Sequence, residues 1–353
     1  MSNGDTTSNK LNLNINKDMK FHLLIILFIN VLGFSGIVNA QKWEIDFIPV
    51  SDIFAISEQH LILTSNSEVN SAFSLELKND TSYSFKPLIK GGFGPGEMLE
   101  ISDIEYDSDK NYVWFVNRYN GKIIAHNYTD DVMIERLTDH IIIPSISIKD
   151  DLLLISVNPL IDGAYLESIK TITLAYLYQD SNCIDTLIIP TNMLELDKIN
   201  GIEKYSPIQI FSNSILLEND IVTSIQGFDF LISTSLSNSK KHKKIQTGFN
   251  VDLPFEIINS PIYGKGQRTG SINQTMKKWK NYLFIASGLG TANSENKYNI
   301  NIYKNEIKID SFDLLVNYAS YNLKYSINNG NIFYMDGNSL IKLKIENLIS
   351  IKL

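Results

Sequence analysis

The sequence predicts an all-β fold, a six-bladed β-propeller in which each blade is a four-stranded antiparallel sheet. Almost every segment after Gln41 is a short run rich in Ile, Val, Leu, Tyr and Phe, closed by Asn, Asp, Gly or Ser, which is typical of strands. The same strand order returns about every 52 residues, which favours a ring of repeated blades. Helical periodicity is nearly absent: Thr191–Glu203 predicts only a short helix or turn in a connection.

The clearest repeat unit runs from Ile101 to Leu137. Its first strand ends in the acidic turn 107–110, and its strongly apolar second strand is Tyr112–Asn117. A third strand, Lys122–Tyr128, and a fourth, Val132–Leu137, complete the unit. Four antiparallel strands joined by tight turns form one propeller blade.

The other blades are predicted from weaker copies of this unit. Tyr325–Ile345 contains the hairpin dipeptides Asn329-Gly330 and Asp336-Gly337. Further starts lie near Ser51, Pro144, Pro207 and Ser271. In the copy near Pro207, strands are expected at 208–212, 214–218, 228–233 and 244–248. Six starts favour six blades, and seven blades of about 45 residues each are the alternative.

The two ends of the ring are predicted to meet in one blade. Trp43–Pro49 reads as a strand, and we expect it to pair with the last blade near Leu340–Leu353. Such pairing would fasten the ring and remove an open sheet edge.

The N-terminal region reads as a secretory signal peptide, residues 1–40, followed by a single propeller domain, residues 41–353. Phe21–Phe34 is an apolar run of 14 residues behind a short basic start, and small residues lead to the expected cleavage after Ala40. A membrane span needs about 20 apolar residues, so a retained anchor is the less favoured alternative. Met19 would make a conventional initiator, and we take it as a hypothesis for the true start. We therefore expect export, to the periplasm or the cell exterior.

Cysteine usage agrees with a chain stabilised by its core alone. Cys183 is the only cysteine, so we expect no internal disulfide and no lipid anchor through cysteine. Because Cys183 adjoins the predicted strand Ile184–Ile189, we expect a buried, unreactive thiol.

The charge balance disfavours two classes of partner. A net charge of −8 argues against general binding to nucleic acid or to anionic lipid. The most basic run, Lys240–Lys244, is expected to form a solvated hairpin tip, with attachment to an anionic glycan as the alternative.

The segment GGFGPGEML, Gly91–Leu99, lies between two predicted strands. A phosphate-binding loop needs a following helix and usually a Lys-Ser/Thr pair, whereas this segment places Glu97 there and continues into a strand. We therefore interpret it as a blade-junction motif. Its glycines permit unusual backbone angles, Pro95 stiffens the turn, and Glu97 can accept hydrogen bonds from exposed amides. The motif residues are Gly91, Gly92, Gly94, Pro95, Gly96 and Glu97.

The junction and the blade after it, residues 91–128, resemble the G-x-G-P-G-E-F…D-I-x-x-D…V-x-D…N-x-R-I-x-x-Y pattern of bacterial NHL-like and TolB-like six-bladed β-propellers. These are exported proteins abundant in Bacteroides and its relatives. Asn117 stands where aspartate is common in the pattern, and Lys122 where arginine is common. The resemblance implies export and a ring of blades, and it does not imply a ligand.

Candidate site residues are few, and we assign no catalytic residue. The histidines after residue 40 have no zinc-binding spacing, and no Gly-x-Ser-x-Gly elbow occurs. Hydrolases of this architecture, including lactonases, hold a divalent ion in the central channel with Asp, Glu and Asn. The residues here that could face the channel are Asp52, Asp103, Glu105, Asn273 and Asn322. Asp103 and Glu105 share one strand face by the period of two, although acidic residues beside turns are usually only solvated.

The sequence therefore favours a binding scaffold over an enzyme. The expected partner is a protein, a glycan or a small molecule at one propeller face, and we expect a monomer without a cofactor. The alternative is a hydrolase or lactonase that depends on a divalent cation in the channel. Tryptophans and tyrosines could stack on sugars, but most are expected to fill the gaps between blades.

Overall fold

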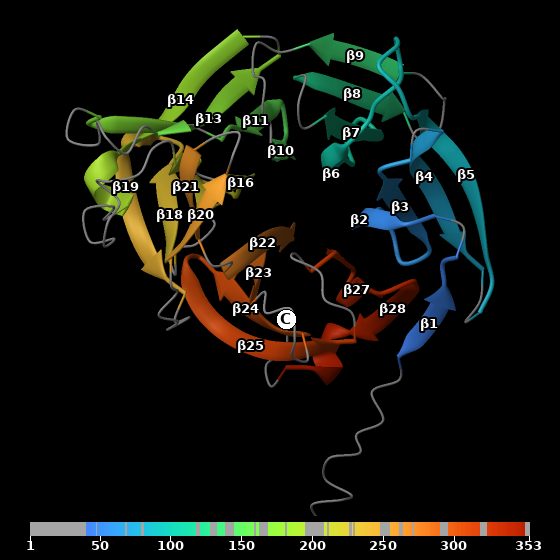
Figure 1. Ribbon diagram of the computed structural model, residues 1–353. Coiled ribbons are helices and arrows are strands. Elements are labelled where there is room, and N and C mark those ends of the chain that lie inside the picture. Colours follow the sequence, from blue (N-terminus) through green and yellow to red (C-terminus); the bar gives the residue numbers. More distant parts are fainter. Residues whose placement is uncertain are drawn as a thin grey trace, which may run out of the picture. The chain divides into compact units, whose positions relative to one another are not determined.

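Short antiparallel strands build the chain, and among the described residues they form six four-stranded sheets and two two-stranded sheets (Figure 1). Helical structure there is limited to two short turns, η2 (Thr191–Leu194) and η5 (Ile345–Asn347). The predicted six-bladed propeller is confirmed, and the seven-blade alternative is wrong. The computed structural model describes residues 40–46, 48–67, 69–78, 81–117, 121–127, 133–137, 145–158, 160–161, 169–180, 182–194, 208–209, 212–225, 228, 230–247, 255–260, 264–269, 272–289, 296–317 and 323–349.

The first three blades follow one another along the chain, each starting with its innermost strand. Blade 1 consists of β2 (Val50–Ala55), β3 (His60–Ser65), β4 (Asn70–Leu77) and β5 (Tyr83–Lys90). Blade 2 consists of β6 (Ile101–Asp107), β7 (Tyr112–Asn117), β8 (Lys122–Asn127) and β9 (Met133–Leu137). Blade 3 consists of β10 (Ile146–Lys149), β11 (Leu152–Ser156), β13 (Thr171–Gln179) and β14 (Asn182–Pro190).

The last three blades complete the ring. Blade 4 consists of β16 (Ser212–Leu216), β17 (Asp220–Ile225), β18 (Phe230–Ser235) and β19 (Asn238–Gln246). Blade 5 consists of β22 (Ile272–Trp279), β23 (Tyr282–Leu289), β24 (Asn296–Lys304) and β25 (Ile307–Val316). Blade 6 consists of β26 (Tyr325–Asn328), β27 (Asn331–Asp336), β28 (Ser339–Lys344) and the N-terminal β1 (Gln41–Glu44).

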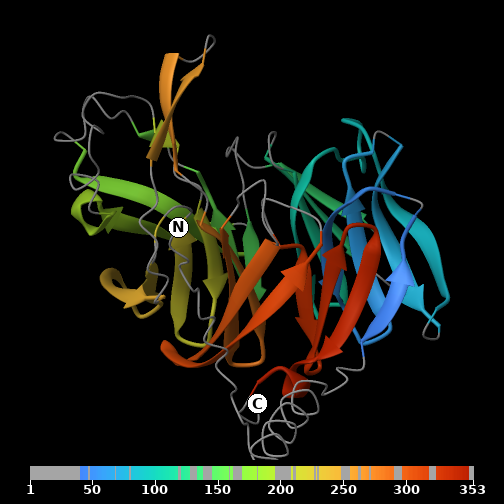
Figure 2. The same cartoon turned by 60° about the horizontal axis from the view of Figure 1, so that its bottom comes forward.

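The apolar core lies between neighbouring blades. Each of six clusters of buried residues joins two adjacent blades, for example Ile62 of blade 1 with Ile104 and Phe115 of blade 2. The innermost strands β2, β6, β10, β16, β22 and β26 contact one another in turn around the ring. Figure 2 shows blade 5 beside the closing blade 6. This packing surrounds a central channel with the edges of six inner strands.

The predicted pairing of the N-terminal strand with the last blade is confirmed, although the strand is Gln41–Glu44 and not Trp43–Pro49. β1 pairs antiparallel with β28, so that Trp43 lies opposite Leu340. Trp43 is 3% exposed and packs in the cluster that contains Leu340 and Phe333 of blade 6 and Ile53 of blade 1. The first and last strands of the described residues therefore complete one blade.

The strand assignment near Pro207 is wrong for blade 4. Ser212–Leu216 is the innermost strand, and Asp220–Ile225, which the prediction passed over, is the second. Its Thr223 and Ser224 interrupt the apolar pattern that we used to recognise strands. β15 (Ile208–Gln209) instead pairs with β12 (Leu160–Ile161) in a small separate sheet. The second small sheet pairs β20 (Phe255–Ser260) with β21 (Gly264–Thr269).

Two further expectations are wrong for the same reason, which is that the outermost strand of a blade is open to solvent. Lys240–Lys244 is not a hairpin tip but lies within β19, where lysines protect an exposed sheet edge against pairing with other chains. Cys183 is exposed in β14, the outermost strand of blade 3, and is not buried. Its thiol donates to the carbonyl oxygen of Asp185 at 3.4 Å.

We expect Trp43→Ala to lower the free energy of unfolding by about 3–5 kcal/mol, because it removes a buried indole at the closure of the ring. Urea denaturation measures this. The neighbouring Lys42→Ala, at an exposed position, is the control and should change stability by no more than about 0.5 kcal/mol. Equal stability of the two variants would mean that β1 does not fasten the ring.

Candidate functional site

The innermost strand of every blade is a sheet edge. The backbone amide and carbonyl groups on its free side therefore have no strand of the same sheet to pair with. Polar side chains of the neighbouring blade supply partners. The Ser326 hydroxyl of blade 6 accepts from the amide of Ala55 in blade 1 at 2.8 Å. The Ser147 hydroxyl of blade 3 accepts from the amide of Leu216 in blade 4 at 3.0 Å. The channel wall is therefore polar because the fold requires acceptors there.

Asp103 fills this role for two blades at once. Its Oδ1 accepts from the amide of Ile104 on its own strand at 2.9 Å, and its Oδ2 accepts from the amide of Ile146 in blade 3 at 2.9 Å. Asp52 of blade 1 repeats the first of these contacts, since its Oδ1 accepts from the amide of Ile53 at 2.8 Å. Asp103 therefore links the inner strands of blades 2 and 3, whereas this contact of Asp52 stays within its own strand.

Two adjacent lysines of blade 5 reach across the channel to the carboxylates. Lys277 Nζ lies 3.8 Å from Asp52 Oδ2 and 3.9 Å from Asp103 Oδ1. Lys278 Nζ lies 3.6 Å from Glu105 Oε1 and donates to the Ile148 carbonyl oxygen at 2.7 Å. Successive strand residues leave opposite faces of the blade, which is why the two lysines meet different partners. We call Asp52, Asp103, Glu105, Lys277 and Lys278 the channel cluster; it joins blades 1, 2, 3 and 5.

The low exposure of the channel cluster shifts its ionisation. Burial raises the pKa of Asp103 to about 7, against the opposing charge of Lys277, and the nearby Asp52 and Glu105 carboxylates add to the increase. Burial likewise raises the pKa of Glu105, against Lys278. Burial opposes the charge on Lys277, but the three carboxylates together raise its pKa above the ordinary value. Asp103 is therefore partly protonated near neutral pH.

The structure brings together some of the candidate metal ligands and leaves others outside what it describes. Asp103 and Glu105 both face the channel, as their shared strand face predicts, and lysines accompany both. The side chain of Asn273 and the whole of Asn322 lie outside the described residues. Within the described part of the chain, no three His, Cys, Asp or Glu side chains gather as they would around a metal ion. Lys277 and Lys278 were missed, although two lysines on a predicted inner strand were a usable signal.

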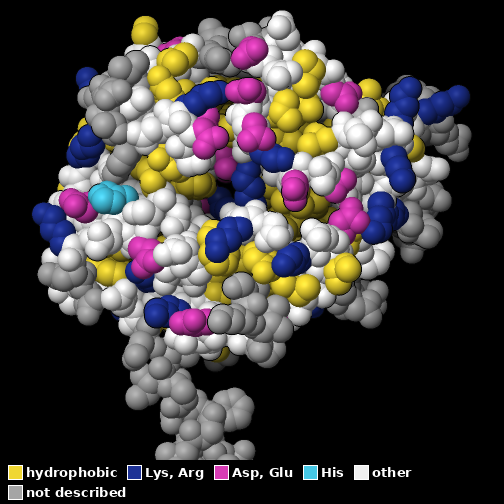
Figure 3. Space-filling model, turned by 180° about the vertical axis from the view of Figure 1, so that it is seen from behind, with side chains coloured by type: hydrophobic (Ala, Val, Ile, Leu, Met, Phe, Trp, Pro, Cys, Tyr) yellow, Lys and Arg dark blue, Asp and Glu magenta, His cyan; other side chains and the backbone are white. Residues whose placement is uncertain are grey.

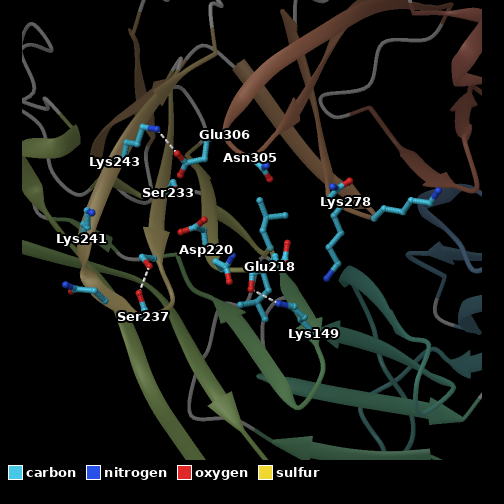
Figure 4. Close-up of a pocket in the computed structure, with 17 residues that line it drawn as sticks. Lys149, Glu218, Asp220, Ser233, Ser237, Lys241, Lys243, Lys278, Asn305 and Glu306 are labelled. Carbon is cyan, nitrogen blue, oxygen red and sulfur yellow. Dashed lines mark hydrogen bonds and ion pairs between the residues drawn. The ribbon is translucent and has the colours of Figure 1, made fainter. Parts of the chain in front are cut away.

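Figure 3 shows a hollow at the middle of one face, with lysine and acidic side chains gathered around it. A pocket of about 980 Å³ lies between blades 4 and 5 (Figure 4). We call it the blade 4–5 pocket; its walls are Lys149, Lys278, residues of the strands β16 to β19, and residues of the β16–β17, β18–β19, β22–β23 and β24–β25 turns. Lys278 belongs to both the pocket and the channel cluster, so the pocket adjoins the channel.

The blade 4–5 pocket is lined almost entirely by polar side chains, and Leu216 and Leu217 are its apolar members. Lys243 on β19 pairs with Glu306 of the β24–β25 turn at 2.6 Å, which links the two blades across the pocket. Lys149 Nζ donates to the Glu218 carbonyl oxygen at 2.6 Å. Hairpin turns supply about half of these residues, and turn residues give little sequence signal for a shared pocket.

The blade-junction motif lies between β5 and β6 and is held by its own residues and by blade 2. Glu97 Oε2 accepts from the Gly94 amide at 3.0 Å, and the Gly96 amide donates to Glu135 of β9 at 2.8 Å. Lys122 Nζ donates to the carbonyl oxygens of Gly94 at 2.8 Å and Glu97 at 3.0 Å. Gly92 has a φ of 151°, and a Cβ there would lie 2.2 Å from Glu97 Oε2, so glycine is required.

Both departures from the propeller pattern contact this loop. Lys122, which donates to the Gly94 and Glu97 carbonyl oxygens, also lies 3.1 Å from Glu135. The Asn117 side chain donates to the Leu99 carbonyl oxygen. The amides that would face a phosphate are thus occupied by two carboxylates. The motif acts on the packing of blade 2 against blade 1.

Comparison with known proteins gives the fold. The chain is similar to a member of the DUF4221 family from Bacteroides vulgatus ATCC 8482, at 11% identity and a TM-score of 0.55, over 89% of this chain and 97% of that one. It is also similar to a protein of Bacteroides fragilis NCTC 9343 that is named as exported, at 12% identity and a TM-score of 0.51, over 90% and 97% of the two chains.

At these identities the likenesses show a shared fold alone. No protein-family model matches the sequence, and no curated protein is significantly similar to it. No helix in the described part of the chain is long and apolar enough to cross a membrane.

We expect Lys277→Met to lower the free energy of unfolding by about 3–5 kcal/mol at pH 8, because it leaves buried carboxylates without their shared cation. Lys308→Met, at an exposed position of β25, is the matched control and should cost no more than about 0.5 kcal/mol. A similar small loss in both variants would mean that the channel cluster does not hold the ring together.

We expect Asp103→Asn to be less stable than the wild type, because an amide nitrogen cannot accept one of the two backbone N–H groups. The difference in free energy of unfolding between the two proteins should shrink as pH rises from about 4 to 7. The pKa of Asp103 is raised in the folded state, so the wild type loses stability over that pH range, whereas Asn at this position does not titrate. Urea denaturation at pH 4, 5.5 and 7 measures it. A difference that stays constant or widens with pH would contradict the raised pKa.

Proposed function

We propose that this chain is an exported β-propeller binding protein whose ligand binds in the blade 4–5 pocket. The observation that carries the proposal is the pocket itself, which has a volume of about 980 Å³ and walls from three blades. Ligand pockets typically have volumes of about 300–1,000 Å³, and the volume of this one lies within that range. The ligand is a protein segment, a glycan or a small molecule, and the protein acts as a monomer.

The geometry of the channel supports binding over catalysis. Asp103 uses both carboxylate oxygens as backbone acceptors, and Glu105 lies against Lys278. A divalent-cation hydrolase would need these groups to leave their present partners. A binding protein needs no such change, because the pocket lies beside the channel cluster.

Export is the second part of the proposal. It is supported by the predicted signal peptide, residues 1–40, and by the fold shared with a Bacteroides protein that is named as exported. We also infer that the chain belongs with the NHL-like and TolB-like propellers. The support is the GPGE loop, whose glycine and glutamate contacts explain why the motif marks a blade junction.

The binding test uses purified protein and four probes: maltotriose, chitotriose, trigalacturonic acid and hexaglutamate. We expect at least one probe to raise Tm in the wild type, and we expect Asn281→Trp to abolish that shift by filling the pocket from the exposed β22–β23 turn. Gln59→Trp is the matched control, at the equivalent β2–β3 turn of blade 1, and should keep the shift. Each probe is added at 10 mM, which is about a 1,000-fold excess over the protein. The pocket is refuted as the site if no probe shifts Tm, or if Tm shifts equally in Asn281→Trp.

Export is tested by producing the full chain in a Gram-negative host and sequencing the N-terminus of the fractionated protein. We expect product outside the cytoplasm that begins at Gln41. Cytoplasmic protein that retains Thr6–Lys17 would contradict both the export and the start at Met19.

A further inference from the structure

We propose that the blade 4–5 pocket takes an acidic carbohydrate, a short oligosaccharide that carries carboxylate groups. This inference rests on the proposed binding function and adds the class of ligand. It comes from the charge, the hydrogen-bonding groups and the size of the pocket.

The pocket is cationic in a chain that is acidic overall. Five lysines line it against three carboxylates, whereas the whole sequence has a net charge of −8. Lys243 forms an ion pair with Glu306 at 2.6 Å, and Lys278 forms one with Glu105 at 3.6 Å. These two lysines serve the fold.

The other three lysines remain for a ligand. Within the described part of the chain, Lys149, Lys241 and Lys280 make no ion pair with a carboxylate. Lys149 donates to a backbone carbonyl oxygen, and Lys280 lies 4.6 Å from the ring centre of Trp279. The three come from blades 3, 4 and 5, so they surround the pocket and can bind separate anionic groups of one ligand.

The remaining walls match hydroxyl groups. Asn219, Asn238, Asn281 and Asn305 are exposed in the lining and offer both donors and acceptors. Asp220 and Glu218 add acceptors for the hydroxyl groups of a sugar. An acidic peptide fits less well, because peptide recognition relies on apolar anchors and this lining offers two leucines. Charge and hydroxyl-binding groups together therefore favour a sugar acid.

The size of the pocket admits more than one sugar unit. Its volume of about 980 Å³ lies at the upper end of ligand pockets, which hold drug-sized molecules of about 300–1,000 Å³. A di- or trisaccharide fits this space.

The test is isothermal titration calorimetry of purified protein with trigalacturonic acid, maltotriose and hexaglutamate. We expect trigalacturonic acid to bind at least about tenfold more tightly than either of the others at 50 mM NaCl, and to weaken as salt screens the lysines. Lys241→Gln combined with Lys280→Gln should weaken trigalacturonic acid by about tenfold and leave maltotriose unchanged. Lys86→Gln combined with Lys308→Gln, two exposed lysines on outer strands, is the control and should leave binding as in the wild type.

The outcomes separate this inference from the proposed function. Maltotriose that binds as tightly as trigalacturonic acid, with both lost in Asn281→Trp, would overturn the acidic preference and retain the pocket. Hexaglutamate that binds as tightly as trigalacturonic acid would replace the carbohydrate with an acidic peptide. Trigalacturonic acid binding that is unaffected by the Lys241 and Lys280 substitutions would place the anion site elsewhere and refute the inference.

Discussion

The unpaired inner edge of each blade is the constraint on which the rest of the structure depends. Six sheets placed radially leave six strand edges facing the channel, and each edge amide needs an acceptor because no further strand of its sheet pairs with it. Asp103 serves Ile104 and Ile146, and Ser147 and Ser326 serve neighbouring blades. The contacts between blades are therefore apolar in their middle and polar at the axis.

The carboxylate acceptors place negative charge in the channel, and blade 5 supplies the cations that balance this charge. Asp52, Asp103 and Glu105 are buried well enough that their mutual repulsion needs cations, which Lys277 and Lys278 provide. Because Lys278 also lines the pocket, the same side chain connects the support of the ring with the proposed ligand site. A change in the charge of the pocket would therefore change the electrostatic environment of Glu105 through Lys278.

The fold could be predicted from sequence because strand runs and turns repeat locally, and the pairing of the N-terminal strand with the last blade followed from the need to close the ring. The second strand of blade 4 was missed because Thr223 and Ser224 interrupt its apolar run; both lie opposite polar residues, Ser214 and Asn213, of the strand beside it. Cys183 was misplaced because the sequence does not reveal which strand is outermost. The candidate site was only half predictable: Asp103 and Glu105 were recognised, but the pocket joins strand and turn residues of three blades that are far apart in sequence.

The shared sixth blade also sets an order of events in folding. The hydroxyl of Ser339 donates to Glu44 across a sequence separation of 295 residues, so β1 has no partner until almost the entire chain is available. Contacts of such long range slow folding and leave unpaired strands exposed while it proceeds. A chain with this architecture gains from being kept unfolded until its synthesis and any transport are complete, since its last strand pairs with its first.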